Sequence, residues 1–253
     1  MFYDWVRKEG SFMSENQNAF EKIKIINGSW LKIIAVVCML IDHLAYLILP
    51  YFDVCGESFE IFGKTISIIK ICRLIGRLAF PIFAFLITEG FSHTKNYKKY
   101  GLNLLTFAIV SEIPFNLFIS GKVFNLNSQN VFFTLFLGFL ALYILENMKT
   151  DTEKAIYIFG VVILSLLIKG DYGARGVILI VLLYLLKNQL PFASVLSLGL
   201  LSGGVAAWCA FVPINMYNGK RGFIKGKFMK YAFYAFYPVH LFILFAIKKF
   251  ILL

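Results

Sequence analysis

Long apolar runs separated by short polar or basic clusters make up most of this chain. The first run covers positions 29–52, about the length of helix that crosses the hydrocarbon core of a bilayer. Runs of the same kind follow at 65–91, 101–119, 131–145, 155–168, 174–186 and 231–247. The pattern predicts an all-α fold, a polytopic integral membrane bundle of about 8–10 transmembrane helices.

Two parts of the pattern predict short or broken helices. Gly76 and Pro81 interrupt the run at 65–91, and both residue types weaken a continuous helix. Between 190 and 217, a single span would place the basic residues at 220–230 outside the cell, whereas two short spans meeting near Gly203 keep them inside. We prefer the two short spans, which bring the expected total to about nine crossings.

The first 28 residues carry charges throughout and contain no apolar core that would mark a cleavable signal peptide. Lysines just before and inside the start of the first run indicate that this run begins in the cytoplasm. We therefore expect a cytoplasmic or interfacial tail at 1–28 and a membrane domain at 29–253. The protein would be a multi-pass protein of the cell membrane with a cytoplasmic N-terminus.

Composition supports the membrane assignment and removes other classes of function. Hydrophobic residues make up 59% of the 253 positions and charged residues 15%, against about a quarter in soluble domains. The 25 Lys and Arg residues give a net charge of +11, but they cluster at the ends of apolar runs, which is not the pattern of a nucleic-acid-binding surface. The four cysteines and three histidines show no metal-ligand spacing, so no metal site is expected.

Asp42 and His43 stand inside the first apolar run, where hydrocarbon would surround them. An acid at the centre of a span costs roughly 2.5 to 3.5 kcal/mol on insertion scales unless it faces protein or water. Such a residue indicates a functional site, and a structural pair satisfied by a neighbouring helix is the alternative. Because adjacent helical residues point about 100° apart, the two side chains need different partners.

Ionisable residues on three other predicted spans reach a similar depth. At about 1.5 Å of rise per residue, Glu112, His240 and Arg77 lie between the middle and the outer third of the membrane. His43 lies at the same depth, so the four side chains indicate a water-accessible cavity for binding or catalysis. The outer rim above them is expected to carry Asp171, Tyr172 and Arg175.

Helix geometry suggests separate roles for the members of this cluster. Asp42 is expected to pair with a cation such as Arg77. His43 is expected to act as a general base, because neutral imidazole takes up protons at neutral pH, and Glu112 is the candidate to orient it. His240 has a second interpretation as a packing histidine beside a proline kink.

Basic clusters on the cytoplasmic side predict a site for a phosphate-bearing ligand. They comprise Lys95, Lys98 and Lys99 in one loop and Asn218, Lys220 and Arg221 in another. Glycines beside the second cluster allow the backbone to approach a phosphate closely. The positive-inside tendency alone would also place lysines here, so the Asn-Gly-Lys-Arg-Gly turn is the more informative part.

Six segments together resemble the TraX family, which is named after the acetylase of conjugative pilin. They are LKIIAVVCMLIDHLAYL at 31–47, IGRLAFPIFAFLITEGFSHT at 75–94, KYGLNLLTFAIVSEIPFNL at 99–117, GDYGARGV at 170–177, YNGKRG at 217–222 and KYAFYAFYPVHL at 230–241. They follow in order and are spread over nearly the whole chain after residue 28. The family is similar in layout to the transmembrane acyltransferase superfamily, whose essential histidine in the first span points here to His43.

The resemblance implies a membrane acetyltransferase that binds acetyl-CoA from the cytoplasm and delivers the acetyl group at or across the membrane. The favoured acceptor is an N-terminal amine of an exported pilin or peptide, and a hydroxyl of a cell-surface glycan or lipid is the alternative. The basic clusters would hold the CoA phosphates, and Arg77 or Asn116 would stabilise the oxyanion. Direct transfer and transfer through acetyl-histidine both stay open.

A proton-coupled transporter is the alternative from another class, since buried charges also form proton pathways. An inverted repeat of broken helices would favour transport, and we find no convincing one. The expected partners are therefore acetyl-CoA, a peptide, pilin or glycan acceptor and the lipid bilayer, with no nucleic acid.

Overall fold

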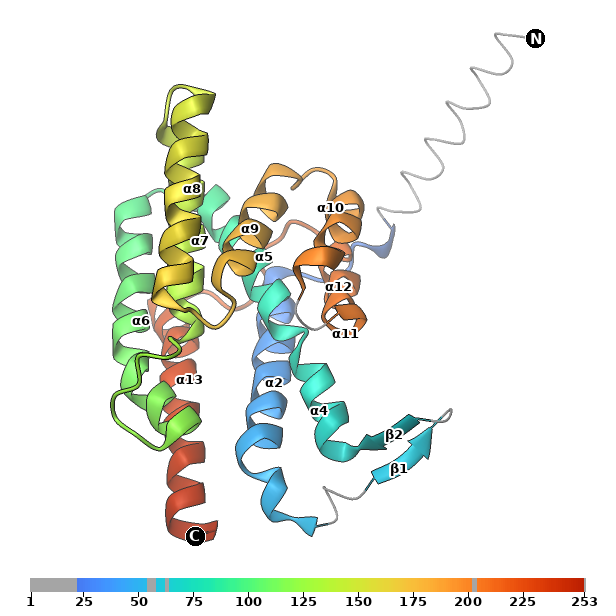
Figure 1. Ribbon diagram of the computed structural model, residues 1–253. Helices are drawn as coiled ribbons and strands as arrows, with labels where there is room; N and C mark the ends of the chain where they lie inside the picture. The colour runs from blue at the N-terminus through green and yellow to red at the C-terminus, as the bar shows by residue number, and fades with distance from the viewer. Residues whose placement is uncertain (1–21, 54–57, 62–63, 202–203, 253) are drawn as a thin grey trace, which may run out of the picture.

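The computed structural model of the protein describes residues 22–53, 58–61, 64–201 and 204–252 and shows a helical bundle with one two-stranded hairpin (Figure 1). The α-helices are α2 (Gly28–Leu47), α4 (Ile68–Gly76), α5 (Ala79–His93), α6 (Tyr97–Ser120), α7 (Val131–Asn147), α8 (Asp151–Ile168), α9 (Gly173–Leu185), α10 (Leu190–Leu196), α11 (Gly204–Trp208), α12 (Phe211–Asn215) and α13 (Gly226–Ile247). Strand β1 (Ser58–Ile61) pairs antiparallel with β2 (Lys64–Ser67). The all-α membrane fold is confirmed, and the hairpin is an addition that the apolar pattern did not predict.

Four helical stretches are long and apolar enough to cross a membrane. They are Gly28–Tyr51, Ile68–His93, Tyr97–Ser120 and Gly226–Leu252. Shorter apolar helices are Val131–Asn147, Gly173–Leu185, Leu190–Leu200 and Gly204–Asn215. The expected break near Gly76 is present, because α4 ends there and α5 begins at Ala79. The ambiguous region likewise forms two short helical stretches in place of one long helix.

Asparagine side chains cap three of the helices that build the site. Asn27 caps α2, Asn96 caps α6 and Asn130 caps α7, in each case by accepting a hydrogen bond from a backbone N–H of the first turn. A cap of this kind contributes about 1 kcal/mol and fixes the residue at which the helix begins. The capped helix starts therefore set the depth at which the side chains of the first turns lie.

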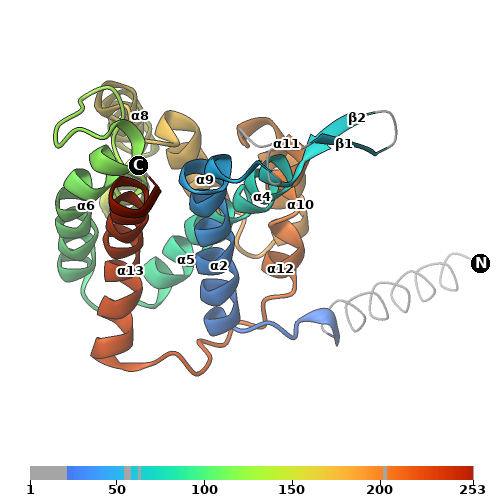
Figure 2. The same ribbon diagram turned by 90° about the horizontal axis from the view of Figure 1, so that it is seen from below.

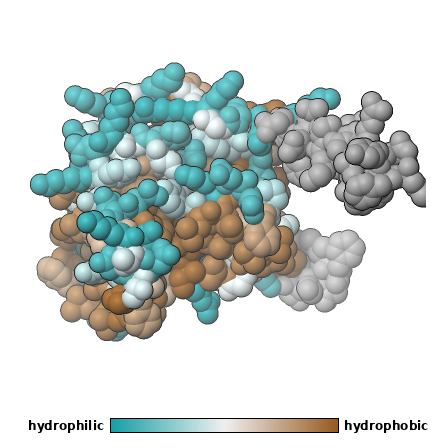
Figure 3. Space-filling view, turned by 90° about the horizontal axis from the view of Figure 1, so that it is seen from above, coloured by the Kyte–Doolittle hydropathy of each residue, from teal (hydrophilic) through white to brown (hydrophobic). Residues whose placement is uncertain are grey.

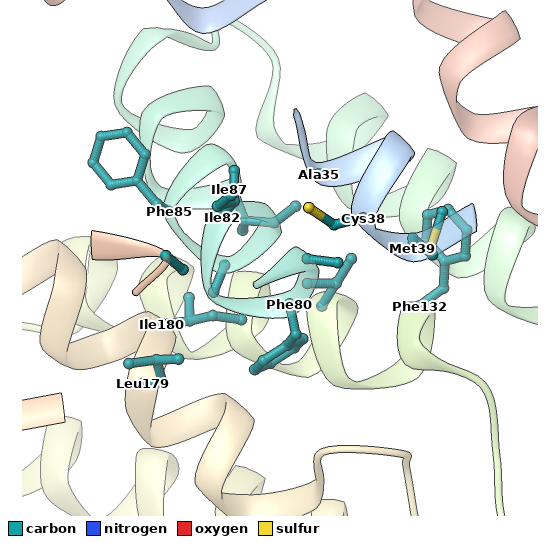
Figure 4. Close-up of a cluster of buried hydrophobic side chains, with 14 of the residues drawn as sticks. Ala35, Cys38, Met39, Phe80, Ile82, Phe85, Ile87, Phe132, Leu179 and Ile180 are labelled. Carbon is teal, nitrogen blue, oxygen red and sulfur yellow. The ribbon is translucent and has the colours of Figure 1, made fainter. Parts of the chain in front are cut away.

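Helix α5 forms the centre of the core, where it packs against α2, α7 and α9. Its side chains Phe80, Ile82 and Phe85 are each at most 3% exposed. Figure 4 shows them beside Leu179 and Ile180 of α9, which are also fully buried. Because α5 is buried on several sides, it gives the neighbouring helices a fixed position against which functional side chains can be held.

Two groups of helices meet along one boundary. Helix α2 packs on α4 and α5, whereas α13 packs mainly on α6. Figure 2 shows α6 and α13 to one side of α2, with α4 on the other side. In Figure 3, which views the opposite end of the bundle, hydrophilic residues gather on one side of the face and hydrophobic residues on the other. Apolar side chains such as Phe159 and Leu167 of α8 are exposed and suit contact with lipid.

Candidate active site

His43 of α2 and His240 of α13 form a hydrogen-bonded pair across the boundary between the two helix groups. Nδ1 of His43 lies 2.7 Å from Nε2 of His240, and the two rings stack with centroids 5.0 Å apart. His240 is 5% exposed. Its interpretation as a packing histidine alone does not fit this contact, since His240 lies in the position beside His43 that the sequence predicts for Glu112.

The contacts of His240 determine where the protons of a neutral pair lie. Nδ1 of His240 is 2.7 Å from the backbone oxygen of Phe236, which can only accept, so this nitrogen carries the proton. Nε2 of His240 must then accept the hydrogen bond that Nδ1 of His43 donates. Nε2 of His43 is left with its lone pair, which is the arrangement a general base needs.

Asp42 pairs with Arg73 and not with Arg77, the cation named from the sequence. Nη1 of Arg73 donates to Oδ2 of Asp42 at 2.6 Å, and its guanidinium lies over the ring of Tyr46 at 5.2 Å. The contact depends on Gly76, because a Cβ at that position would overlap the Asp42 side chain. Arg73 lies one turn before Arg77, and only the close approach of α4 to α2 decides between them.

Arg77 lies instead among the residues predicted for the outer rim. It interacts electrostatically with Asp171, and together with Tyr172 it lines a small pocket. The ring of Tyr172 stacks on Phe80 with centroids 3.5 Å apart. Of the three predicted rim residues, Asp171 and Tyr172 therefore adjoin Arg77. Arg175, on α9, is exposed at the surface.

Glu112 holds the start of α7 and Asn116 holds the loop that follows α6, so the structure gives both residues contacts other than those predicted for them. Oε1 of Glu112 accepts from the backbone N–H of Asn130 at 3.0 Å and from the side-chain amide of the same residue. Asn116 donates through Nδ2 to the backbone oxygen of Val123 at 3.2 Å. A helix N-terminus at this depth needs a negative partner, and Glu112 provides it, so it does not orient His43.

A cavity of about 660 Å³ lies between α2, α5, α6, α7 and α13 and ends beside the histidine pair. Its inner wall includes Met39, one helical turn before His43, and Tyr237. The Tyr237 ring lies edge-on to both histidines, with centroids 6.4 Å from His43 and 5.8 Å from His240. Tyr237 therefore separates the cavity from the imidazoles by a single side chain.

Four basic side chains line the other end of this cavity, which we call the basic end. They are Lys32, Lys99, Arg221 and Lys230. They come from α2, α6, α13 and the loop before α13, and Arg221 interacts electrostatically with both Lys32 and Lys230. A group of cations drawn from four separate elements suits a ligand with several phosphates.

Only some of the six predicted phosphate-binding residues line the cavity. Lys99 and Arg221 line the cavity, whereas Lys95, Lys98, Asn218 and Lys220 are outside the set of described residues that line it. Sequence reasoning missed Lys32 and Lys230, because the positive-inside tendency already accounts for a lysine at the end of a span. Whether these two lysines face the cavity depends on how α2 and α13 are rotated about their own axes.

The Asn-Gly-Lys-Arg-Gly turn is held against the start of α2. Oγ of Ser29 donates to the backbone oxygen of Arg221 at 3.1 Å and accepts from the N–H of Ile224 at 2.7 Å. Asn218 accepts from the N–H of Lys220 and so closes the turn. Gly222 has a φ of 86°, and a Cβ there would overlap Asn27 and Ser29. The turn thus fixes the backbone of Arg221 at the cavity.

Within the described residues, no group of three or more His, Cys, Asp or Glu side chains is arranged to hold a metal ion. The chemistry that these residues themselves offer is proton transfer at the histidine pair and anion binding at the basic end.

Comparison with known proteins places the chain in a family. Residues 27–248 match the family described as "TraX protein". The chain is 31% identical over 249 residues to the "Probable fimbrial assembly protein FimC, serogroup H1" of Dichelobacter nodosus, with 87% of this chain and 95% of the relative covered. No solved structure matches the chain.

Proposed function

Because the chain belongs to the TraX family, we propose that it is a membrane acetyltransferase that moves the acetyl group of acetyl-CoA to an amine of an exported pilin or peptide. The name of the FimC relative, a probable fimbrial assembly protein, supports an acceptor among the subunits of a surface fibre. The N-terminal amine is the group of such a subunit that an acetyl transfer would modify.

The observation that carries this proposal is a cavity with four cations at one end and, at the other, only the Tyr237 side chain between it and the histidine pair. Lys32, Arg221 and Lys230, with Lys99, would hold the phosphates of CoA at the basic end. The wall between the ends is mostly apolar and aromatic, which suits the pantetheine arm. The thioester would then lie beyond Met39 and Tyr237, next to His43.

The same arrangement supports an orientation in the membrane. Four cations lie at one end of the cavity, and positively charged residues of membrane proteins are retained on the cytoplasmic side. This end, with the start of α2, would face the cytoplasm, where acetyl-CoA is available. The histidine pair would then lie deeper, on the route of the acetyl group to an acceptor at or across the membrane.

The histidine pair would act on the acceptor in two proton transfers. The amine nitrogen attacks the thioester carbonyl carbon, and Nε2 of His43 takes the proton that the amine loses. The tetrahedral intermediate collapses, the carbon–sulfur bond breaks, and the CoA thiolate takes that proton from His43. The products are an acetyl amide and CoA. The positive charge of Arg73 acts on His43 and would also favour the oxyanion.

Binding and transfer can be tested on the purified protein in lipid nanodiscs. Acetyl-CoA binding is measured by calorimetry, and transfer of radiolabelled acetyl to a synthetic peptide with a free N-terminus is counted, with an N-blocked peptide as control. Arg221→Ala should weaken acetyl-CoA binding about tenfold or more, whereas Lys220→Ala, one residue away and outside the cavity lining, should leave it unchanged. Absence of acetyl-CoA binding to the wild type would overturn the proposal, as would equal binding by both variants.

A further inference from the structure

Glu89 is the only acid among the described residues that line the cavity. It stands near the end of α5, with its side chain 21% exposed. It lines the cavity together with Lys32 and Lys99, which lie near the N-terminal ends of α2 and α6. A carboxylate here is unexpected in a site for phosphates, because it repels them.

The Glu89 carboxylate is held in place by neighbouring side chains. Tyr217 forms a side-chain hydrogen bond with it, and burial together with the Glu89 charge raises the pKa of that hydroxyl, which keeps its proton to donate. Tyr217 is itself fixed by a bridge to Ile26 and by the edge of Phe85 at 5.3 Å. Nε2 of His93 lies 3.6 Å from Oε2 of Glu89.

The four cavity cations leave this carboxylate available to a ligand. Among the ion pairs of the described residues, Glu89 pairs with His93 and with none of the four. Since Glu89 repels phosphate while the cations attract it, a bound ligand must place its phosphates against the four cations and away from the Glu89 carboxylate. The part of the ligand that faces α5 must be uncharged and must donate hydrogen bonds.

Asn96, in the connection between α5 and α6, adds a donor to the lining of the same cavity. Its Oδ1 accepts from the backbone N–H of Lys99 at 2.8 Å as the cap of α6, which leaves its amide N–H groups as the donors that it can offer to a ligand. A carboxylate acceptor and an amide donor that line the same cavity complement one edge of adenine, which presents an exocyclic amino group next to a ring nitrogen that accepts.

We propose that Glu89 and Asn96 form the subsite for the base of the nucleotide and select an adenine ring through its exocyclic amino group. The proposal rests on the proposed function, since it takes the nucleotide to be that of CoA. A base with a carbonyl oxygen in place of the amino group would point an acceptor at the Glu89 carboxylate and leave that carboxylate without a donor. The site should therefore reject such an analogue, as sites with unpaired polar groups do.

The test compares CoA with its deaminated analogue, in which hypoxanthine replaces adenine and the phosphates and pantetheine arm are unchanged. Binding of each to the purified full-length protein in nanodiscs is measured by calorimetry. The wild type should bind CoA about tenfold or more tightly than the analogue. Glu89→Gln should bring the two affinities close together, and Tyr217→Phe, which frees the carboxylate, should reduce the preference in part.

Glu146→Gln is the matched control. This carboxylate accepts from the hydroxyl of Tyr184 at 2.6 Å, outside the cavity lining, so the variant should keep the wild-type preference. Equal binding of CoA and the analogue by the wild type would overturn the base subsite and leave the proposed function standing, as would a preference that survives in Glu89→Gln. Failure of the wild type to bind either compound would count against the proposed function itself.

Discussion

His43 and His240 meet through one 2.7 Å hydrogen bond although 197 positions separate them in the sequence. The proton that Nδ1 of His240 donates to Phe236 sets the direction of this bond, and the direction in turn leaves the lone pair on Nε2 of His43. In this arrangement His240 is a positioning residue for His43, the role that a carboxylate has in many other catalytic pairs.

Removal of His240 should therefore lower the catalytic rate more than it weakens binding. Loss of the base itself in His43→Ala should reduce kcat by about 10² to 10⁴. His240→Ala should lower kcat with little change in KM for acetyl-CoA, because the cations at the other end of the cavity are untouched. His240→Gln, whose side-chain oxygen can accept from His43, should lose less. Steady-state kinetics with wild-type kcat in His240→Ala would contradict the assigned role.

The rate should depend on pH through the same pair. A proton added to Nε2 of His43 removes the lone pair that takes the acceptor's proton, so the rate should fall as the pH is lowered and rise as the pair is deprotonated. A pH profile of kcat/KM measures this dependence. The residual activity of His43→Ala should lack that acid limb, and an unchanged profile in this variant would show that another group titrates.

Substitution of Gly76 should destabilise the protein by separating Asp42 from Arg73. A Cβ in Gly76→Ala would overlap the Asp42 side chain, and overpacking of this kind costs about 1 to 3 kcal/mol. Gly160→Ala in α8 is the matched control, because its Cβ meets nothing within 4 Å. It should be neutral or stabilising by about 0.5 to 1 kcal/mol. Thermal unfolding in detergent compares the two, and equal midpoints would refute the close-packing argument.

Loss of the Ser29 hydroxyl should affect the ligand site without affecting the chemistry. Ser29→Ala removes one hydrogen bond to Arg221 and one from Ile224, and leaves the N–H of Ile224 unpaired in a buried position. The expected cost is about 1 to 3 kcal/mol. KM for acetyl-CoA should rise while kcat stays near the wild-type value. Ser29→Thr, which keeps the hydroxyl, should recover part of the affinity, and a fall in kcat alone would argue against this role.

The apolar pattern predicted the membrane fold because hydrocarbon length is a strong constraint on sequence. It also brought His43 and His240 to the same depth, since rise per residue is constant in a helix. Depth alone did not identify the partner of His43, because Glu112 lies at a depth similar to that of His240. The packing of α13 beside α2, and the need of α7 for an acceptor at its start, distinguish the two.

The basic end was predicted only in part for a related reason. Lysines occur at the ends of most spans, and the sequence does not state which of them face inward. Lys32 and Lys230 lie on helix faces that line the cavity, whereas Lys98 lies on an exposed face of α6 and Lys95 lies in the exposed loop before it. The strands at 58–61 and 64–67 carry no periodic signal long enough to distinguish them from a loop.

The pairing of α2 with α13 has a consequence for biosynthesis. The ribosome makes one imidazole near the start of the membrane domain and the other in its last long helix, so a nascent or truncated chain that lacks 226–253 has no partner for His43. In the proposed mechanism, proton transfer at full efficiency requires that α13 has been inserted beside α2. The activity would then be acquired only after α13 has entered the membrane, late in the insertion of the bundle.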